Sequence, residues 1–187
     1  MATKKTKPIV ATCWLAGCAG CHMSFLDIDE RIVALSELVD FSVSPITDFK
    51  VLPEVDIALI EGAVANEDNM EVLKEFRKKA KFLIAFGDCA IFGNLPAMRN
   101  AFTVKECLEE AFLDTESTVN PNGIIPTGED VPKLLPKVLT VPQVVKTDYN
   151  LPGCPPDADA IWFLLTELLA GRVPEPTEIP YKDFKFD

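Results

Sequence analysis

The stretch VDIALIEG at residues 55–62 has an apolar centre, IALI, and stops at a glycine. FLIAFG at 82–87 has the same form, and IVATCW at 9–14 is a third short apolar run. The segments 24–38 and 68–79 instead carry apolar side chains at helical spacing. Apolar strands that alternate with amphipathic helices predict an α/β fold: a doubly wound parallel sheet with helices on both faces.

Weaker patterns predict the remaining elements. Phe41–Val43 and Val141–Val145 have the composition of short strands, and residues 104–112 and 157–169 have the pattern of helices. Ser24 is expected to be the N-cap of the helix that follows it.

The rest of the chain lacks a clear period. Residues 120–142 are rich in proline and glycine and predict extended surface chain. The length of 187 residues predicts a single domain. We expect its core to span about residues 9–172, with a flexible segment at 1–8 and an extended tail at 173–187.

Charge and composition limit the partners. The formal net charge of −11 argues against nucleic acid and against an anionic membrane, because both attract Lys and Arg. No apolar run is long enough to cross a bilayer. The start of the chain is polar and has neither the apolar middle of a secretory signal nor a twin arginine. These features predict a cytoplasmic protein.

Four of the six cysteines stand beside glycine in three separate motifs. GCAGC at 17–21, GDCAIFG at 87–93 and PGCPP at 152–156 each follow a predicted strand, at the edge where doubly wound sheets bind their ligands. In a reducing compartment six cysteines favour metal binding over disulfides. Four thiolates can ligate one iron–sulfur cluster or one zinc ion. The candidate ligands are Cys18, Cys21, Cys89 and Cys154.

The arrangement of the cysteines favours the cluster, with zinc as the alternative. Structural zinc commonly uses two Cys-x-x-Cys pairs, and this chain has one pair and two isolated cysteines. A thioredoxin-type dithiol would use Cys18 and Cys21 alone. Helices expected to begin at Ser24 and Asp157 would direct their positive ends at the site, which suits an anionic cluster. The single histidine, His22, excludes His-rich zinc and di-iron sites.

Residues near the cysteines are candidates for supporting roles. His22 is expected to hydrogen-bond a cluster sulfur, to carry a proton, or to lie in an interface. Glu61 is expected to bind loop N–H groups or to relay protons. Gly87 and Gly153 would let the backbone approach the metal closely. The remaining candidates are Asp88 and Arg99 for polar contacts, Trp14 and Phe92 for shielding from water, and Cys13 and Cys107 for the core.

The motifs CAGCHMSF at 18–25, IEGA at 60–63, GDCAIFG at 87–93 and PGCPP at 152–156 together resemble the small subunit of [NiFe] hydrogenases. The resemblance is strongest to the short small subunit of cytoplasmic NAD-reducing (bidirectional) enzymes and covers about Ile9 to Arg172. It implies a flavodoxin-like fold and a subunit of a hydrogen:NAD⁺ oxidoreductase. It also implies one proximal [4Fe-4S] cluster, held by Cys18, Cys21, Cys89 and Cys154.

The same resemblance assigns roles to partner chains. The nickel–iron site would lie on the large subunit, so no catalytic residue is expected in this chain. Electrons would pass from that site toward a diaphorase module that holds the other iron–sulfur clusters, FMN and NAD(P). An additional FMN in this chain is conceivable from the fold, but no phosphate-binding loop supports it. A small subunit that serves another acceptor, such as F420, and a zinc-stapled binding module without redox activity are the alternatives.

Overall fold

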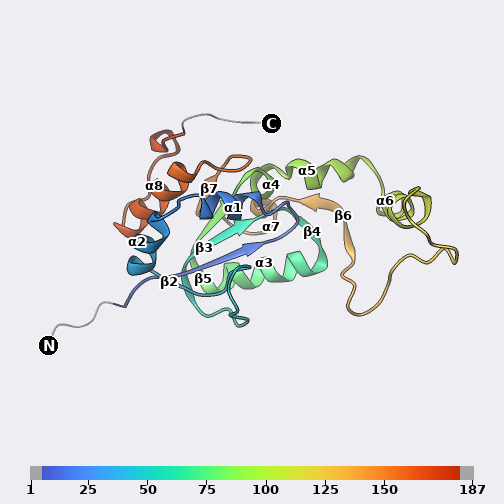
Figure 1. Ribbon diagram of the computed structural model, residues 1–187, viewed down its shortest axis with the longest axis horizontal. Helices are drawn as coiled ribbons and strands as arrows, with labels where there is room; N and C mark the ends of the chain where they lie inside the picture. Colours follow the sequence, from blue (N-terminus) through green and yellow to red (C-terminus); the bar gives the residue numbers. More distant parts are fainter. Residues whose placement is uncertain (1–5, 182–187) are drawn as a thin grey trace.

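The computed structural model describes residues 6–181. Its body is a five-stranded parallel sheet in the order β2-β1-β3-β5-β7 (Figure 1). This order, in which the chain first goes to one side of β1 and then returns to the other, is that of flavodoxin-like sheets. The predicted doubly wound parallel fold is therefore confirmed. The strands are β1 (Ile9–Trp14), β2 (Asp40–Phe41), β3 (Val55–Glu61), β5 (Ala80–Phe86) and β7 (Tyr149–Leu151).

Two separate apolar cores lie on the two faces of the sheet. One is formed with α1 (Gly20–Leu26), α2 (Arg31–Leu38) and α8 (Ala158–Leu169). The other is formed with α3 (Glu67–Lys79), α4 (Asp88–Phe92) and α7 (Val141–Val144). Figure 1 shows α3 and α8 on opposite sides of the strands. The largest buried side chains include Leu73 on one face and Ile161, Leu164 and Leu165 on the other.

A second, smaller unit extends from the sheet toward the right of Figure 1. Strands β4 (Val64–Asn66) and β6 (Leu134–Leu139) pair antiparallel. After α4, the chain reaches β6 through α5 (Asn94–Ala97), the 3-10 turn η1 (Met98–Ala101), α6 (Val104–Glu109) and the π-helical turn η2 (Glu110–Asp114). A short 3-10 turn, η3 (Pro176–Glu178), follows α8. Within residues 6–181, no helix is long and apolar enough to cross a membrane.

The predicted strand at Val141–Val145 is wrong. Val141–Val144 form α7, whose first turn contains Pro142, a residue that helix starts tolerate because its missing N–H has no partner there. The Gln143 side chain also accepts a hydrogen bond from the Thr140 N–H, at 2.9 Å. The last strand of the sheet is β7 instead, so Cys154 follows β7. The expected extended chain at 120–142 likewise contains β6.

The predicted helix from Ser24 to Leu38 is two helices. Asp29 has a positive φ of 55°, which an α-helix does not accommodate, and it separates α1 from α2. Because α1 already begins at Gly20, Ser24 lies inside it and is not its N-cap. The Ser24 hydroxyl donates a hydrogen bond to the Pro156 carbonyl at 2.5 Å instead. This contact joins α1 to the loop that leads into α8.

Two shorter predictions need adjustment. The expected strand at Phe41–Val43 is the two-residue β2. The expected tail at 173–187 is packed against the body as far as the structure describes it, because Ile179 is buried and Tyr181 contacts the same core. Residues 1–5 and 182–187, which belong to the two predicted terminal segments, lie outside the described residues.

An ion pair joins α3 to the residue that precedes β7. Arg77 donates to the Asp148 carboxylate at 2.6 Å, and the Leu83 N–H of β5 donates to the same oxygen at 2.8 Å. Burial opposes ionisation of Asp148, but these hydrogen bonds and the Arg77 charge hold its pKa below the ordinary value.

We expect Asp148→Asn to reduce the free energy of unfolding by about 1 kcal/mol at neutral pH, because the pair is only partly buried. A carboxyl group with a lowered folded-state pKa stabilises above its unfolded pKa of about 3.9. Its contribution is lost as pH falls through the folded pKa. Urea unfolding from pH 7 to pH 3 should therefore show the two proteins converging at the acid end. A constant difference over that range would contradict this account.

Candidate metal centre

Four strand ends stand level at the carboxyl edge of the sheet. In the register of the sheet, Trp14 pairs with Glu61, Glu61 with Phe86, and Phe86 with Leu151. The cysteine motifs begin within a few residues of these ends. Cys18 follows β1, Cys21 lies in the first turn of α1, Cys89 lies in the first turn of α4, and Cys154 follows β7. Segments that are far apart in the sequence therefore reach one edge.

The four thiols are near enough to influence one another electrostatically. Burial raises the pKa of the Cys89 thiol to about 11, and the thiols of Cys154 and Cys18 contribute to the same rise. Burial also raises the pKa of Cys21 well above its ordinary range, assisted by Glu61 and then by the other three thiols. Thiols that disfavour one another's ionisation are suited to binding a positive metal centre, which stabilises all the thiolates at once.

Within residues 6–181, no group of three or more His, Cys, Asp or Glu side chains is arranged to hold a single metal ion. A [4Fe-4S] cube offers a separate iron atom to each of four cysteines. The four thiols, which come from three loops at one edge, suit such a group in donor type and donor number.

Gly87 leaves the space that Cys21 occupies. A Cβ built on Gly87 would lie 2.2 Å from the Cys21 Sγ, and the backbone φ of +86° is one that side chains rarely adopt. At Gly153, with φ +136°, a Cβ would lie 2.5 Å from the Pro156 Cα. Both glycines predicted from the motifs therefore have a steric reason to be glycine.

Glu61 holds the first turn of α1 at the end of β3. Its two carboxylate oxygens accept the N–H groups of Cys21, at 3.3 Å, and of His22, at 3.0 Å. Its side chain is only 2% exposed. The expectation that Glu61 binds loop N–H groups is confirmed.

His22 is buried within this chain, which does not fit the alternative of an interface histidine. Its Nδ1 contacts the Glu61 carboxylate and its Nε2 lies 2.8 Å from the Thr12 hydroxyl. With both ring nitrogens engaged in this way, none is left to hydrogen-bond a sulfur. The sequence could not indicate Thr12, because it lies ten residues before His22 in β1.

Asp88 and Ser24 connect the loops to one another. The Asp88 carboxylate accepts the Gly153 N–H at 2.7 Å, and the Asp88 N–H donates to the Gly153 carbonyl at 3.0 Å. The Cys89 loop is thereby fastened to the Cys154 loop. The contact from Ser24 to Pro156 fastens α1 to that same loop. Each cysteine-bearing segment is thus tied to another by polar contacts that do not involve sulfur.

Two N–H groups point at sulfur. The Gly20 N–H donates to the Cys18 Sγ at 3.4 Å, and the Asn94 amide donates to the Cys154 Sγ at 3.5 Å. Asn94 was not among the predicted residues. Its signal in the sequence is its place directly after Gly93, in a turn where Asn94 has a positive φ of 36° that asparagine tolerates.

Other predicted candidates lie elsewhere or remain uncovered. Arg99 donates to the carbonyls of Ala65 and Leu135 at 2.9 Å each, so it supports the β4–β6 pair and not the cysteine edge. Trp14 and Phe92 are 46% and 63% exposed, so neither is fully covered within this chain.

The two remaining cysteines are separate from the site. Cys13 is buried in the core on the α3 face, as predicted, and burial raises its pKa to about 12. Cys107 is only half-buried on α6, so the prediction of a core position is wrong.

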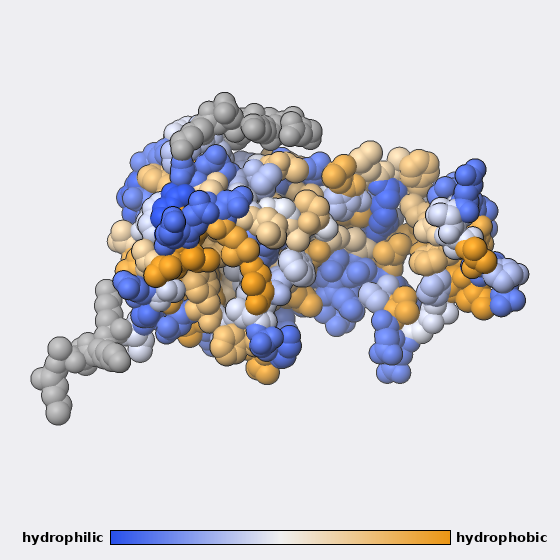
Figure 2. Space-filling view, in the orientation of Figure 1, coloured by the Kyte–Doolittle hydropathy of each residue, from blue (hydrophilic) through white to orange (hydrophobic). Residues whose placement is uncertain are grey.

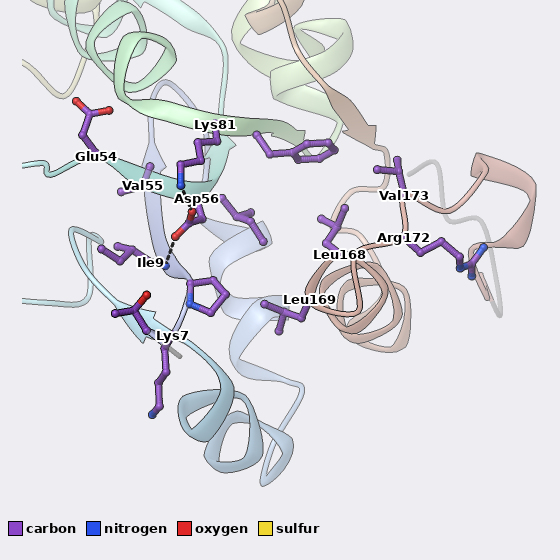
Figure 3. A pocket seen from close by; sticks show the side chains of 15 residues that line it. Lys7, Ile9, Glu54, Val55, Asp56, Lys81, Leu168, Leu169, Arg172 and Val173 are labelled. Carbon is purple, nitrogen blue, oxygen red and sulfur yellow. Dashed lines mark hydrogen bonds and ion pairs between the residues drawn. The ribbon is translucent and has the colours of Figure 1, made fainter. Parts of the chain in front are cut away.

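A cavity of about 700 Å³ lies at the opposite edge of the sheet. Figure 3 shows it between the amino ends of the strands and the end of α8, with Ile9, Val55 and Leu168 among its walls. The Asp56 carboxylate in this cavity accepts hydrogen bonds from the Lys81 Nζ, at 2.7 Å, and from the Ile9 N–H, at 2.8 Å. This cavity contains none of the cysteines.

Comparisons with known proteins agree with the geometry. Residues 18–168 match the family model described as NADH ubiquinone oxidoreductase, 20 Kd subunit. The chain is 43% identical to the NAD-reducing hydrogenase HoxS subunit delta of Cupriavidus necator, covering 100% of this chain and 88% of that protein. It is 40% identical to a subunit of the F420-non-reducing hydrogenase of Methanothermobacter thermautotrophicus, covering 91% of this chain and 55% of that protein.

A solved structure is similar over nearly its whole length. A chain in the crystal structure of an NAD⁺-reducing [NiFe]-hydrogenase in the H2-reduced state superposes with a TM-score of 0.91 at 48% sequence identity. The match covers 97% of this chain and 99% of that chain. The family model, the relative that is 43% identical over the whole chain and the matching solved structure show that the chain belongs to the family of small subunits of NAD-reducing [NiFe] hydrogenases.

Proposed function

We propose that this chain is the electron-transfer small subunit of a cytoplasmic NAD(P)-reducing [NiFe] hydrogenase and carries one proximal [4Fe-4S] cluster. The ligands we assign are Cys18, Cys21, Cys89 and Cys154. The observation that carries the proposal is the meeting of four electrostatically coupled thiols from three loops at one sheet edge. When bound, such a cluster supplies reversible one-electron transfer at a potential set by its surroundings.

The residues of this chain hold and orient the ligands. Glu61 anchors the backbone of Cys21, and Asp88 joins the Cys89 loop to the Cys154 loop. Gly87 leaves room for the Cys21 sulfur. The N–H donors from Gly20 and Asn94 to sulfur would favour the reduced state, because they stabilise negative charge on the ligands.

The exposed apolar side chains around the cysteine edge suit a permanent partner. Leu95 and Met98 on α5 and η1 are 62% and 68% exposed, close along the chain to Phe92. Trp14 and Met23 are exposed on the other side of Cys18 and Cys21. Figure 2 shows apolar side chains gathered along the edge over α5. Large exposed apolar patches mark interaction sites, and obligate interfaces are rich in such residues.

We assign this edge to the hydrogenase large subunit, whose nickel–iron site would then lie near the cluster. In the complex, Trp14 and Phe92 would be covered and would exclude water from the sulfurs. A diaphorase module with the other iron–sulfur clusters, FMN and the NAD(P) site would accept the electrons. The large subunit would split hydrogen, and this chain would bind the large subunit and pass its electrons toward the diaphorase module.

The test is metal analysis of the intact complex, purified without oxygen. We expect Cys89→Ala and Cys154→Ala each to lower the iron and sulfide content by about four atoms per complex and to remove one paramagnetic signal. Cys107→Ala is the matched control, because it removes a half-buried cysteine away from the site and should lose neither.

The alternative functions predict different experimental results. A separately expressed chain that is colourless, with one zinc ion and no sulfide, would overturn the cluster assignment in favour of a zinc-stapled module. Hydrogen-dependent reduction of F420 and not of NAD⁺ or NADP⁺ by the complex would overturn the assigned acceptor.

A further inference from the structure

A row of buried polar side chains crosses the sheet beside Cys21. It runs from Glu61 on β3 through His22 on α1 to Thr12 on β1, and ends at Ser44 in the loop after β2. Thr12 and Ser44 join through their hydroxyl groups at 2.9 Å. These residues are brought together from four segments of the chain. Only Ser44 lies in a partly exposed loop; the other three side chains are buried.

The imidazole of His22 has one available orientation. The Trp14 ring contacts it edge-on at 5.7 Å between centroids, and the Phe86 ring does so at 6.3 Å. Thr12 holds its Nε2 and Glu61 holds its Nδ1. A buried polar group without its partner is costly, so packing and hydrogen bonding select the same ring position.

The Glu61 carboxylate is buried and accepts the N–H groups of Cys21 and His22, but the edge-on ring contacts of Trp14 and Phe86 are made to His22. The last torsion of a glutamate side chain is broad, and its carboxylate could turn away from the α1 backbone. The ring of His22 contacts the same oxygen that accepts the His22 N–H, which leaves the other oxygen facing the Cys21 N–H. The His22 ring and the N–H groups of Cys21 and His22 therefore all hold the Glu61 carboxylate against the first turn of α1.

We propose that His22 is a positioning residue for Cys21. It fixes the Glu61 carboxylate in the one orientation that holds the Cys21 N–H, and thereby places the Cys21 sulfur in the space beside Gly87. Thr12 orients the ring from its other side, and Ser44 orients Thr12. The inference rests on the proposed function, in which Cys21 is a cluster ligand.

Two substitutions distinguish the contact made by the His22 Nδ1 from the contact made by its Nε2. His22→Asn keeps a nitrogen near the position of Nδ1, and His22→Gln keeps one near the position of Nε2. In the intact complex we expect His22→Gln to speed hydrogen exchange of the residue 21 amide about tenfold, the effect of one lost hydrogen bond to a charged group. We expect His22→Asn to remain within about threefold of the wild type, because it still reaches Glu61. Iron release to a chelator should follow the same order.

Two further variants keep the test decisive. Thr12→Val preserves side-chain shape and should affect the amides of residues 21 and 22 in the same direction but less strongly. Leu73→Ala destabilises the opposite core, where Leu73 is fully buried, and should not single out these amides. Equal exchange at residue 21 in the His22→Gln and His22→Asn proteins would overturn the proposal.

The failure of this inference differs from the failure of the proposed function. Suppose that the wild-type complex lacks the predicted iron and sulfide, while the two His22 variants still differ in hydrogen exchange at residue 21. This result would overturn the cluster assignment and support the positioning role of His22. Full iron content in the wild-type complex, with equal exchange in the two His22 variants, would support the cluster assignment and overturn the positioning role of His22.

Discussion

Gly87→Ala should prevent binding of the proposed cluster and should lower the free energy of unfolding of the chain by about 2–5 kcal/mol. Gly87 has φ +86° and ψ 165°, a combination that is essentially restricted to glycine and costs other residues about 1–3 kcal/mol. The new Cβ would also fall 2.2 Å from the Cys21 Sγ, so the sulfur would have to move. Overpacking of this kind adds about 1–3 kcal/mol.

For metal binding, the displacement of the Cys21 sulfur should matter more than the loss of folding free energy. Cys21 is buried and its backbone is held by Glu61, so its side chain has little freedom to retreat. We expect iron and sulfide in the intact complex to fall as far as in the Cys89→Ala protein. Elemental analysis and urea unfolding measure the two effects separately.

Gly171→Ala is the control for backbone strain. Gly171 has a similar φ of +84°, but a Cβ there would meet nothing within 4 Å. We expect it to cost about 1–2 kcal/mol and to leave metal content unchanged. Normal iron content in the Gly87→Ala protein would contradict the assignment of Cys21 as a ligand at this position.

Glu61→Ala should be the most destabilising change of a polar side chain, at about 3–5 kcal/mol. It removes the acceptor for the N–H groups of Cys21 and His22 and for the His22 ring, and all three would stay buried without a partner. Leaving such groups unpaired costs more than the hydrogen bonds are worth when made. We expect the purified complex to lose iron more rapidly than the wild type.

The matched control is Glu75→Ala. Glu75 is a helical glutamate whose side chain is 54% exposed and pairs with Lys79 at 2.8 Å. An exposed pair four residues apart contributes about 0.3–0.5 kcal/mol, so the change should be small. Urea unfolding of both variants compares a buried with an exposed carboxylate. Equal effects would show that Glu61 does not act as the anchor described above.

The elements that could be predicted were those with a strong local pattern. The strand Val55–Glu61 has the bounds that its apolar run indicated, and the helix that begins after Asp157 and ends at Leu169 was also found. Where two patterns competed, the sequence misled. The apolar residues at 141–145 have the composition of a strand, but the Thr140 N–H cap and Pro142 start a helix, and packing against α3 and α4 completes it.

The sequence by itself determined the alternation of most strands and helices and the positions of Cys18, Cys21 and Cys89 just after a strand, whereas the strand before Cys154, β7, was not predicted. Both are local properties, since burial pattern and glycine turns are written in neighbouring residues. Only the tertiary structure decided that the ends of β1, β3, β5 and β7 stand level, and that Glu61 reaches across 40 positions to hold Cys21. Strand register and contacts between distant residues depend on how whole segments pack together, and no short stretch of sequence contains that information.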